Sequence, residues 1–316
     1  MVTASLEIDR QRLIGVVTLI IVAAIIGSAS IGLRVNWASF FALYILSAVF
    51  AVFLPYLRWR SMTSLYSACE NTAISAMIVP STLALTYSAT KLGLPMADGK
   101  LGSADSVLRF STHTLVAFVD KHDTLGHLLN IAYTSLMYQI MFIPFVLCSV
   151  GLTRRAYQFM LGYLLLIITC TICSIPFPSH GALVGQGFDP RHFRWVNQSE
   201  AYGFLASFDA VRNDAGFILN AQNASGIVTF PSLHAAMAAL CAWAVWPSRV
   251  FRLPFLILNA FMMVSAVACG GHYLVDVIAG CLLAMAVSKV VVMKSWRLGW
   301  DLRSATGRLA TQSSQR

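Results

Sequence analysis

The chain has 316 residues, of which 58% are hydrophobic and only 11% are charged, and its mean hydropathy is +0.71. Soluble domains carry about 25% charged residues, so this composition excludes an ordinary soluble domain. The net charge of +9 would suggest a nucleic-acid partner in a soluble protein, but the basic residues here lie mostly between apolar runs. Membrane topology explains them more simply. We therefore expect an all-α, polytopic membrane helix bundle that has the membrane as a partner and does not bind nucleic acid.

Eight apolar segments are candidate membrane spans, because a bilayer core of about 30 Å needs about 20 helical residues. The segments are 13–33, 37–57, 68–90, 128–150, 156–177, 231–248, 253–271 and 274–293. We expect an N-terminal two-span hairpin (1–62), a six-helix membrane domain (63–294) and a cytoplasmic tail (295–316). The seven cysteines lie in or at the ends of apolar runs, which argues against a disulfide framework.

Pairs of basic residues mark every second boundary between these spans. They are Arg10 and Arg12, Arg58 and Arg60, Arg154 and Arg155, Arg249 and Arg252, and Lys294 and Arg297. The positive-inside rule places all of them, and both termini, in the cytoplasm. The connection 179–230 and the histidines His234 and His272 then face the outer side. We expect a bacterial inner (plasma) membrane protein whose two histidines are on the periplasmic or extracellular side.

The stretch 101–128 is too polar to span the bilayer, but its apolar residues recur at roughly helical spacing. This pattern predicts one amphipathic helix lying in the outer interface. Its three histidines, His113, His122 and His127, share no ligand spacing, and we interpret them as interfacial polar residues.

Two histidines lie at the edges of apolar runs, and the second has a carboxylate nearby. His234 follows Phe-Pro-Ser-Leu, and His272 is followed four residues later by Asp276. Positions i and i+4 share a helix face, so Asp276 can reach the ring of His272. A lone histidine near a helix end is usually a satisfied polar residue. An ionisable group in the bilayer costs about 2.5–3.5 kcal/mol on insertion scales, however, so this set favours acid, base and nucleophile chemistry.

Four residues of the outer side are candidates for binding a phosphate. Ser232 lies at the N-cap of the span that begins near Pro231, where free backbone N–H groups form an anion site. Its hydroxyl either caps the helix or contacts a phosphate oxygen. Arg212, in AVRNDAG, offers a bidentate guanidinium, and the alternative is a solvated loop charge. Arg191 and Arg194 are weaker candidates.

The segment GIVTFPSLHAA followed by GGHYLVDVIAG resembles the histidine motifs of the type 2 phosphatidic acid phosphatase superfamily. It is most similar to the branch of inositol phosphorylceramide synthases and their bacterial relatives. The resemblance extends through AVRNDAG, PFPSHGA and ADSVLRF, over roughly residues 64–293. It implies that His272 is the nucleophile, that Asp276 orients it, and that His234 protonates the leaving oxygen. Ser232 and nearby amides would hold the phosphate, and the resemblance implies no metal and no cofactor.

The chain departs from the superfamily pattern at three places. Leu233 stands where a glycine is common, so its amide contact must tolerate a side chain. Ala266 replaces the arginine that usually lies six residues before the second histidine. The Lys-x6-Arg-Pro phosphate clamp is not recognisable, and PFPSHGA lies roughly where it would be. The resemblance therefore leaves the phosphate charge to other groups, such as Arg212 or His180.

The favoured function is a lipid phosphatase or phosphotransferase that hydrolyses a lipid phosphomonoester or pyrophosphate at the outer face through a phosphohistidine. One alternative is transfer of a phospho-head group, of the inositol phosphate type, to a lipid acceptor. An alternative of another class is a proton-coupled transporter that uses His234, His272 and Asp276 as a relay. Transporter sites usually lie near the midplane, often within internal repeats, and neither feature is visible in this sequence.

Overall fold

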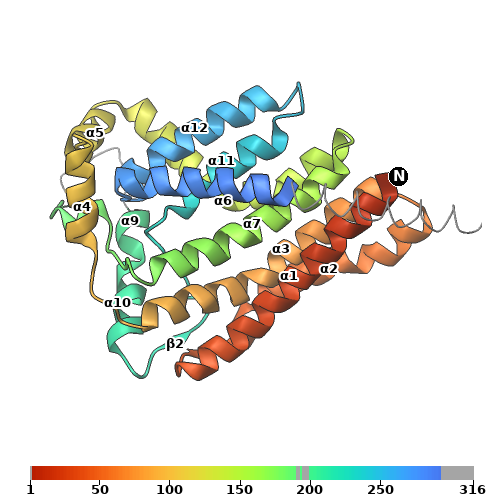
Figure 1. Cartoon of the computed structure of the whole chain (residues 1–316), viewed down its shortest axis with the longest axis horizontal. Helices are drawn as coiled ribbons and strands as arrows, with labels where there is room; N and C mark the ends of the chain where they lie inside the picture. Colours follow the sequence, from red (N-terminus) through yellow and green to blue (C-terminus); the bar gives the residue numbers. More distant parts are fainter. Residues whose placement is uncertain (1, 190–192, 194–198, 293–316) are drawn as a thin grey trace, which may run out of the picture.

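The computed structural model describes residues 2–189, 193 and 199–292. The expected tail 295–316 and the candidates Arg191 and Arg194 lie outside the described residues. The all-α polytopic fold is confirmed, and successive long helices run in alternating directions (Figure 1). Within the described part of the chain, the strands are β1 (Arg34–Val35) and β2 (Ile218–Leu219), which pair in parallel.

Six of the helices in the described residues are long and apolar enough to cross a membrane. They are α1 (Val2–Ser30), α2 (Phe41–Trp59, preceded by the 3-10 turn η1, Trp37–Phe40), α3 (Thr63–Lys91), α6 (Asp123–Ser149), α7 (Thr153–Ser174) and a final helix, Leu274–Val292. The other two expected spans are also helices, α11 (Leu233–Val245) and α12 (Arg252–Ala268). Both fall short of about 20 residues, because α11 lies between Pro231 and Pro247 and α12 ends before the Gly270–Gly271 turn.

The prediction of a single interfacial helix over 101–128 is wrong. The stretch forms the end of α4 (Asp98–Val107), all of α5 (Thr112–Asp120) and the first turn of α6. The chain breaks at Arg109, which has a positive φ of 55°. Ser111 then caps α5, because its hydroxyl accepts a hydrogen bond from the amide of Thr114. A cap and a left-handed residue interrupt the helix, although the apolar spacing continues across the break.

The connection 179–230 is largely folded rather than an open loop. Its described part contains α8 (Ala182–Gly185), α9 (Ser199–Gly203), α10 (Leu205–Asn213) and β2. With α4 and α5, these short helices lie over the end of the bundle at which α11 and the final helix begin (Figure 1).

The basic ends of several helices meet at the opposite end of the bundle. Arg10 of α1 pairs with Glu70 of α3 at 2.7 Å, and Arg154 of α7 pairs with Asp9 of α1 at 2.7 Å. Arg155 donates to two carbonyls in the last turn of α11. The expected grouping of basic residues at one end of the bundle therefore holds for these helices.

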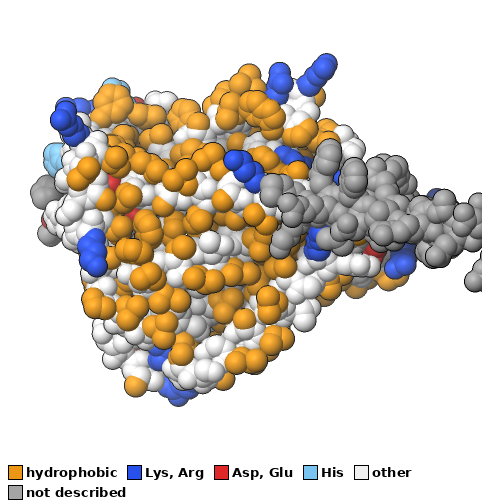
Figure 2. Space-filling model, in the orientation of Figure 1, with side chains coloured by type: hydrophobic (Ala, Val, Ile, Leu, Met, Phe, Trp, Pro, Cys, Tyr) orange, Lys and Arg blue, Asp and Glu red, His pale blue; other side chains and the backbone are white. Residues whose placement is uncertain are grey.

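Hydrophobic side chains cover the middle of the face shown in Figure 2, and lysine and arginine side chains lie mainly toward its ends. Large apolar residues of α1 and α2 are exposed, among them Leu19, Ile26, Phe41 and Val52. Behind them the core is tightly packed. A side chain added at Gly162 of α7 would come within 3.0 Å of Leu240, so this glycine lets α7 and α11 approach closely. The outer surface suits lipid, and the chain is an integral membrane protein.

Candidate active site

His272 and Asp276 lie together at the start of the final helix. The His272 amide donates to the carbonyl of Ala266 in α12 at 3.0 Å, which fixes the turn. The His272 Nδ1 atom is 3.5 Å from Asp276 Oδ2, and the Tyr273 amide donates to the same oxygen at 3.0 Å. The Nδ1 contact has an ion-pair distance but does not complete a hydrogen bond. Nδ1 thus faces the carboxylate of Asp276, and Nε2 is the ring nitrogen that does not.

His234 lies in the first turn of α11 and faces the same space. The ring centroids of His234 and His272 are 6.4 Å apart. Tyr133 of α6 stacks on His234, with ring centroids 4.0 Å apart and ring planes 13° apart. Stacking on an aromatic ring limits the orientations of the imidazole. His234 is therefore held at a defined distance from His272.

The close approach of two helix backbones brings the histidines together. A Cβ atom at Gly280 would collide with the Ser232 carbonyl and lie 3.1 Å from the Ala236 amide. The Ser232 amide donates to the Asp276 carbonyl at 3.0 Å. Ser232 is fully buried, and its hydroxyl accepts from the Ala235 amide at 3.3 Å. Of the two roles open to this hydroxyl, the structure shows the helix cap, and the half-buried Leu233 follows it.

Asp105 of α4 anchors the helix that carries Asp276. Its two carboxylate oxygens accept from the amides of Leu274 and Val275, both at 2.9 Å, and the residue is 1% exposed. These amides belong to the first turn of the helix, which has no intrahelical partners for them. A carboxylate there also interacts favourably with the helix dipole. Asp105 thus sets the position of the helix from which Asp276 projects.

Asp98, at the start of α4, forms hydrogen bonds on the other side of the turn that precedes the final helix. It accepts from the Ser179 hydroxyl at 2.7 Å, the His180 amide at 3.2 Å and the Tyr273 hydroxyl at 3.2 Å. Burial, together with the neighbouring Asp98, raises the pKa of Tyr273, so the phenol stays protonated as a donor. Through Asp98, Ser179 and His180 are therefore held beside Tyr273, the residue that follows His272.

A family model for the PAP2 superfamily matches residues 99–290. The chain belongs to the PAP2 superfamily. The match runs from the first turn of α4 almost to the end of the final helix, so it contains both histidines, Asp105 and Asp276. Members of the superfamily are generally phosphatases and phosphotransferases, and this chain is a membrane enzyme of that type. No curated protein and no solved structure matches the chain.

Two of the predicted phosphate ligands have other contacts in this PAP2 protein. His180 Nε2 lies 3.0 Å from Asp209 Oδ1, and its ring meets Phe208 edge-on. Arg212 lies over the same Phe208 and donates through Nη2 to the Leu94 carbonyl at 2.8 Å. Its Nη1 is buried without a hydrogen-bond partner. Neither side chain forms a hydrogen bond, ion pair or ring contact with His234 or His272, so their role as phosphate ligands stays a prediction.

Sequence reasoning missed three residues that shape the PAP2 site, namely Asp98, Asp105 and Tyr133. Asp105 lies in ADSVLRF, which belongs to the resemblance, but no local spacing links it to the amides at 274 and 275. Tyr133 is one of several aromatic residues in an apolar span and carries no signal of its own. The one hint in the sequence was that Asp98 and Asp105 lie close together along the chain, near the start of the stretch that is too polar to span the bilayer.

Proposed function

We propose that this PAP2 enzyme cleaves a lipid phosphate through a covalent phosphohistidine on His272. The observation that carries the proposal is the 6.4 Å separation of two imidazole rings, one beside a carboxylate, at one end of an apolar bundle. A nucleophile approaches its target at roughly 3–3.5 Å, and a proton donor needs about 2.6–3.2 Å to the leaving atom. The separation of the ring centroids is of the same order as the sum of these reaches, which supports placing one phosphoryl group between the rings.

In the first step, Nε2 of His272 attacks phosphorus, the P–N bond forms and the P–O bond to the lipid alcohol breaks. His234, in its protonated form, donates its proton to the departing oxygen. Asp276 holds the Nδ1–H of His272 and offsets the positive charge that develops on the ring. The three groups lie close together in the fold before the substrate arrives, which lowers the entropic part of the barrier.

In the second step, a hydroxyl attacks the phosphohistidine. His234, now neutral, takes the proton of the attacking oxygen, the P–N bond breaks, and His272 returns to its starting form. Water as the attacking group gives hydrolysis, which we favour, and a second alcohol gives transfer. Backbone amides at the start of α11, including that of Leu233, together with Arg212 Nη1, offer donors to the phosphate oxygens.

We place the site at the extracytoplasmic face. The support is that basic residues gather at the opposite end of the bundle, where Arg10 and Arg154 form their ion pairs. A cysteine introduced at the exposed Gln186, which follows α8, should react with a membrane-impermeant maleimide in intact cells. A cysteine at Arg60 should react only after permeabilisation. The reverse pattern would place the histidines in the cytoplasm.

The experiment for the reaction is phosphate release by the purified full chain from a panel of lipid phosphates. The panel contains phosphatidate, phosphatidylglycerophosphate, an isoprenyl pyrophosphate and a sphingoid phosphate, each with and without inositol. His272→Ala should reduce release to background, and His234→Ala should reduce it about 10²–10⁴-fold, the usual range for a general acid. His122→Ala is the matched control, because His122 is exposed and contacts only its own helix turn and Phe118. Turnover by His272→Ala would refute the proposal.

A further inference from the structure

A cavity lies at the end of the bundle opposite the histidines. It has a volume of about 370 Å³, within the range of small-molecule sites, and is formed by α1, α3, α7 and the α2–α3 turn. Its walls include Arg10, Arg58, Thr63, Ser67 and Tyr157. All but the last precede the segment that matches the PAP2 family model. The cavity is therefore separate from the proposed reaction.

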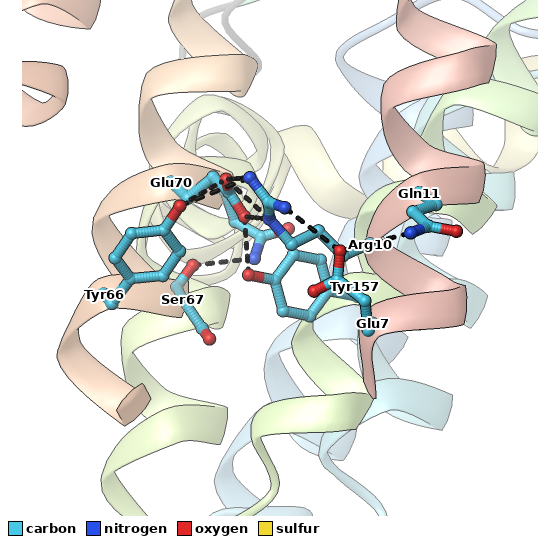
Figure 3. Close-up of polar contacts among 8 residues, drawn as sticks. Glu7, Arg10, Gln11, Tyr66, Ser67, Glu70 and Tyr157 are labelled. Atoms are coloured by element: carbon cyan, nitrogen blue, oxygen red, sulfur yellow. Dashed lines mark hydrogen bonds and ion pairs between the residues drawn. The ribbon is translucent and has the colours of Figure 1, made fainter. Parts of the chain in front are cut away.

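The floor of this cavity is a hydrogen-bonded network centred on Arg10 and Glu70, with Glu7 at its edge (Figure 3). Arg10 donates to Glu70 through Nε at 2.9 Å and through Nη2 at 2.7 Å. The hydroxyls of Tyr66 and Tyr157 donate to the same carboxylate at 3.0 and 2.6 Å. Arg10 also pairs with the more exposed Glu7 at the edge of the cavity, at 3.3 Å. The charges of Arg10 and Arg58 balance those of Glu7 and Glu70, and Arg58 is the cation that remains available to an anion.

The wall and the mouth of the cavity carry donors without partners. The Ser67 hydroxyl is buried near Tyr157 but completes no hydrogen bond. Arg58 is exposed at the mouth, and within the described chain it forms no hydrogen bond or ion pair through its side chain. The Thr63 hydroxyl lies on the same rim. A guanidinium and two hydroxyls around a small cavity suit a phosphate, which accepts several hydrogen bonds at once.

The surroundings of the mouth indicate that the phosphate comes from a lipid. Trp59 and Tyr56, on the last turn of α2, are 75% and 54% exposed. Exposed Trp and Tyr at the end of an apolar helix are typical of the headgroup level of a bilayer. Apolar residues of α2 continue from there along the outer surface, among them Val52 and Phe53. Acyl chains can lie on this surface while the headgroup enters the cavity.

We infer that the cavity binds the phosphate of a phospholipid headgroup from the leaflet opposite the active site. Arg58 forms the ion pair with the phosphate, and the hydroxyls of Ser67 and Thr63 donate to its remaining oxygens. Bound in this way, the lipid bridges the α2–α3 turn and the starts of α1 and α7. The N-terminal helices thereby gain a function that catalysis at the other end does not require.

The test is lipid binding by the purified full chain, measured by native mass spectrometry during titration with phosphatidylglycerol. Arg58→Gln should weaken the binding of one lipid at least roughly tenfold, the effect of losing one charged hydrogen bond. Arg60→Gln is the matched control, because it removes the same charge two residues away and Arg60 does not line the cavity. Arg60→Gln should change the affinity for phosphatidylglycerol less than twofold. Ser67→Ala should weaken binding several-fold.

Two further probes identify the ligand. Diacylglycerol with the same chains lacks the phosphate and should not compete, and inorganic phosphate lacks the chains and should compete only weakly. Equal effects of Arg58→Gln and Arg60→Gln would overturn the site, since they would indicate diffuse surface charge. Equal competition by diacylglycerol, or by inorganic phosphate at the same concentration, would overturn the assignment to a phospholipid headgroup. A lipid held at the histidine end adds equally to all variants, so the result is independent of the proposed reaction.

Discussion

Replacing Asp105 by asparagine tests whether the first turn of the final helix must be held for the site to work. The carboxylate accepts from two amides at 2.9 Å and is 1% exposed, so solvent cannot replace it easily. Hydrogen bonds to charged groups contribute about 1.5–3 kcal/mol each, and a neutral one about 0.5–1.5 kcal/mol. Asparagine keeps one neutral bond and turns its NH₂ group toward the other amide. The expected loss is on the order of 2–4 kcal/mol.

This loss should appear in catalysis as well as in stability. The helix positions Asp276 and the turn before it positions His272, and a displacement of about 1 Å at a reacting group can cost about 10²-fold in rate. We expect kcat for Asp105→Asn to fall about 10- to 10²-fold with a smaller change in KM, together with a lower thermal unfolding midpoint in detergent. Asp123→Asn is the matched control, because Asp123 accepts from the Thr124 amide at an exposed helix start. A normal kcat for Asp105→Asn would refute the positioning role, even if the unfolding midpoint fell.

Three more substitutions follow from the geometry of the site. Gly280→Ala should abolish activity or folding, because the new Cβ atom meets the Ser232 backbone. In the control Gly27→Ala the new Cβ atom meets nothing within 4 Å, and activity should be unchanged. Equal effects of the two substitutions on phosphate release would contradict the helix contact. Tyr133→Leu should lower kcat several-fold by removing a stacking contact worth about 0.5–1.5 kcal/mol, while Tyr138→Leu on the exposed side of α6 should not. Tyr273→Phe should lower the unfolding midpoint by removing a hydrogen bond to Asp98, and an unchanged midpoint would show that this bond contributes little.

The membrane fold was predictable because its signals are local. Apolar length, the basic pairs and the i, i+4 spacing of His272 and Asp276 are all read within a few turns of helix. Even here, local chemistry changed the outcome at two places. Arg109 and the Ser111 cap divide the amphipathic stretch into two helices. α12 ends before it reaches the length of a membrane span, and the Gly270–Gly271 turn follows it.

The support of the site was not predictable, because it depends on contacts between distant segments. Asp105 and Leu274 are 169 residues apart in the chain, and Asp98 and Tyr273 are 175 apart. No periodicity or spacing within one segment reports such a pair. The same is true of Tyr133, whose aromatic ring looks like core until the fold places it on His234. The chemical groups could be identified from sequence, and their supports required the structure.

The most direct test of the central claim is to look for the covalent intermediate itself. The purified full chain is mixed with a lipid phosphate carrying a labelled phosphoryl group, quenched in alkali, digested and mapped by mass spectrometry. Our account predicts transient label on His272, on the peptide that also contains Asp276, and no label there in His272→Ala. Turnover that proceeds with no label on His272, or with label on another residue, would contradict it.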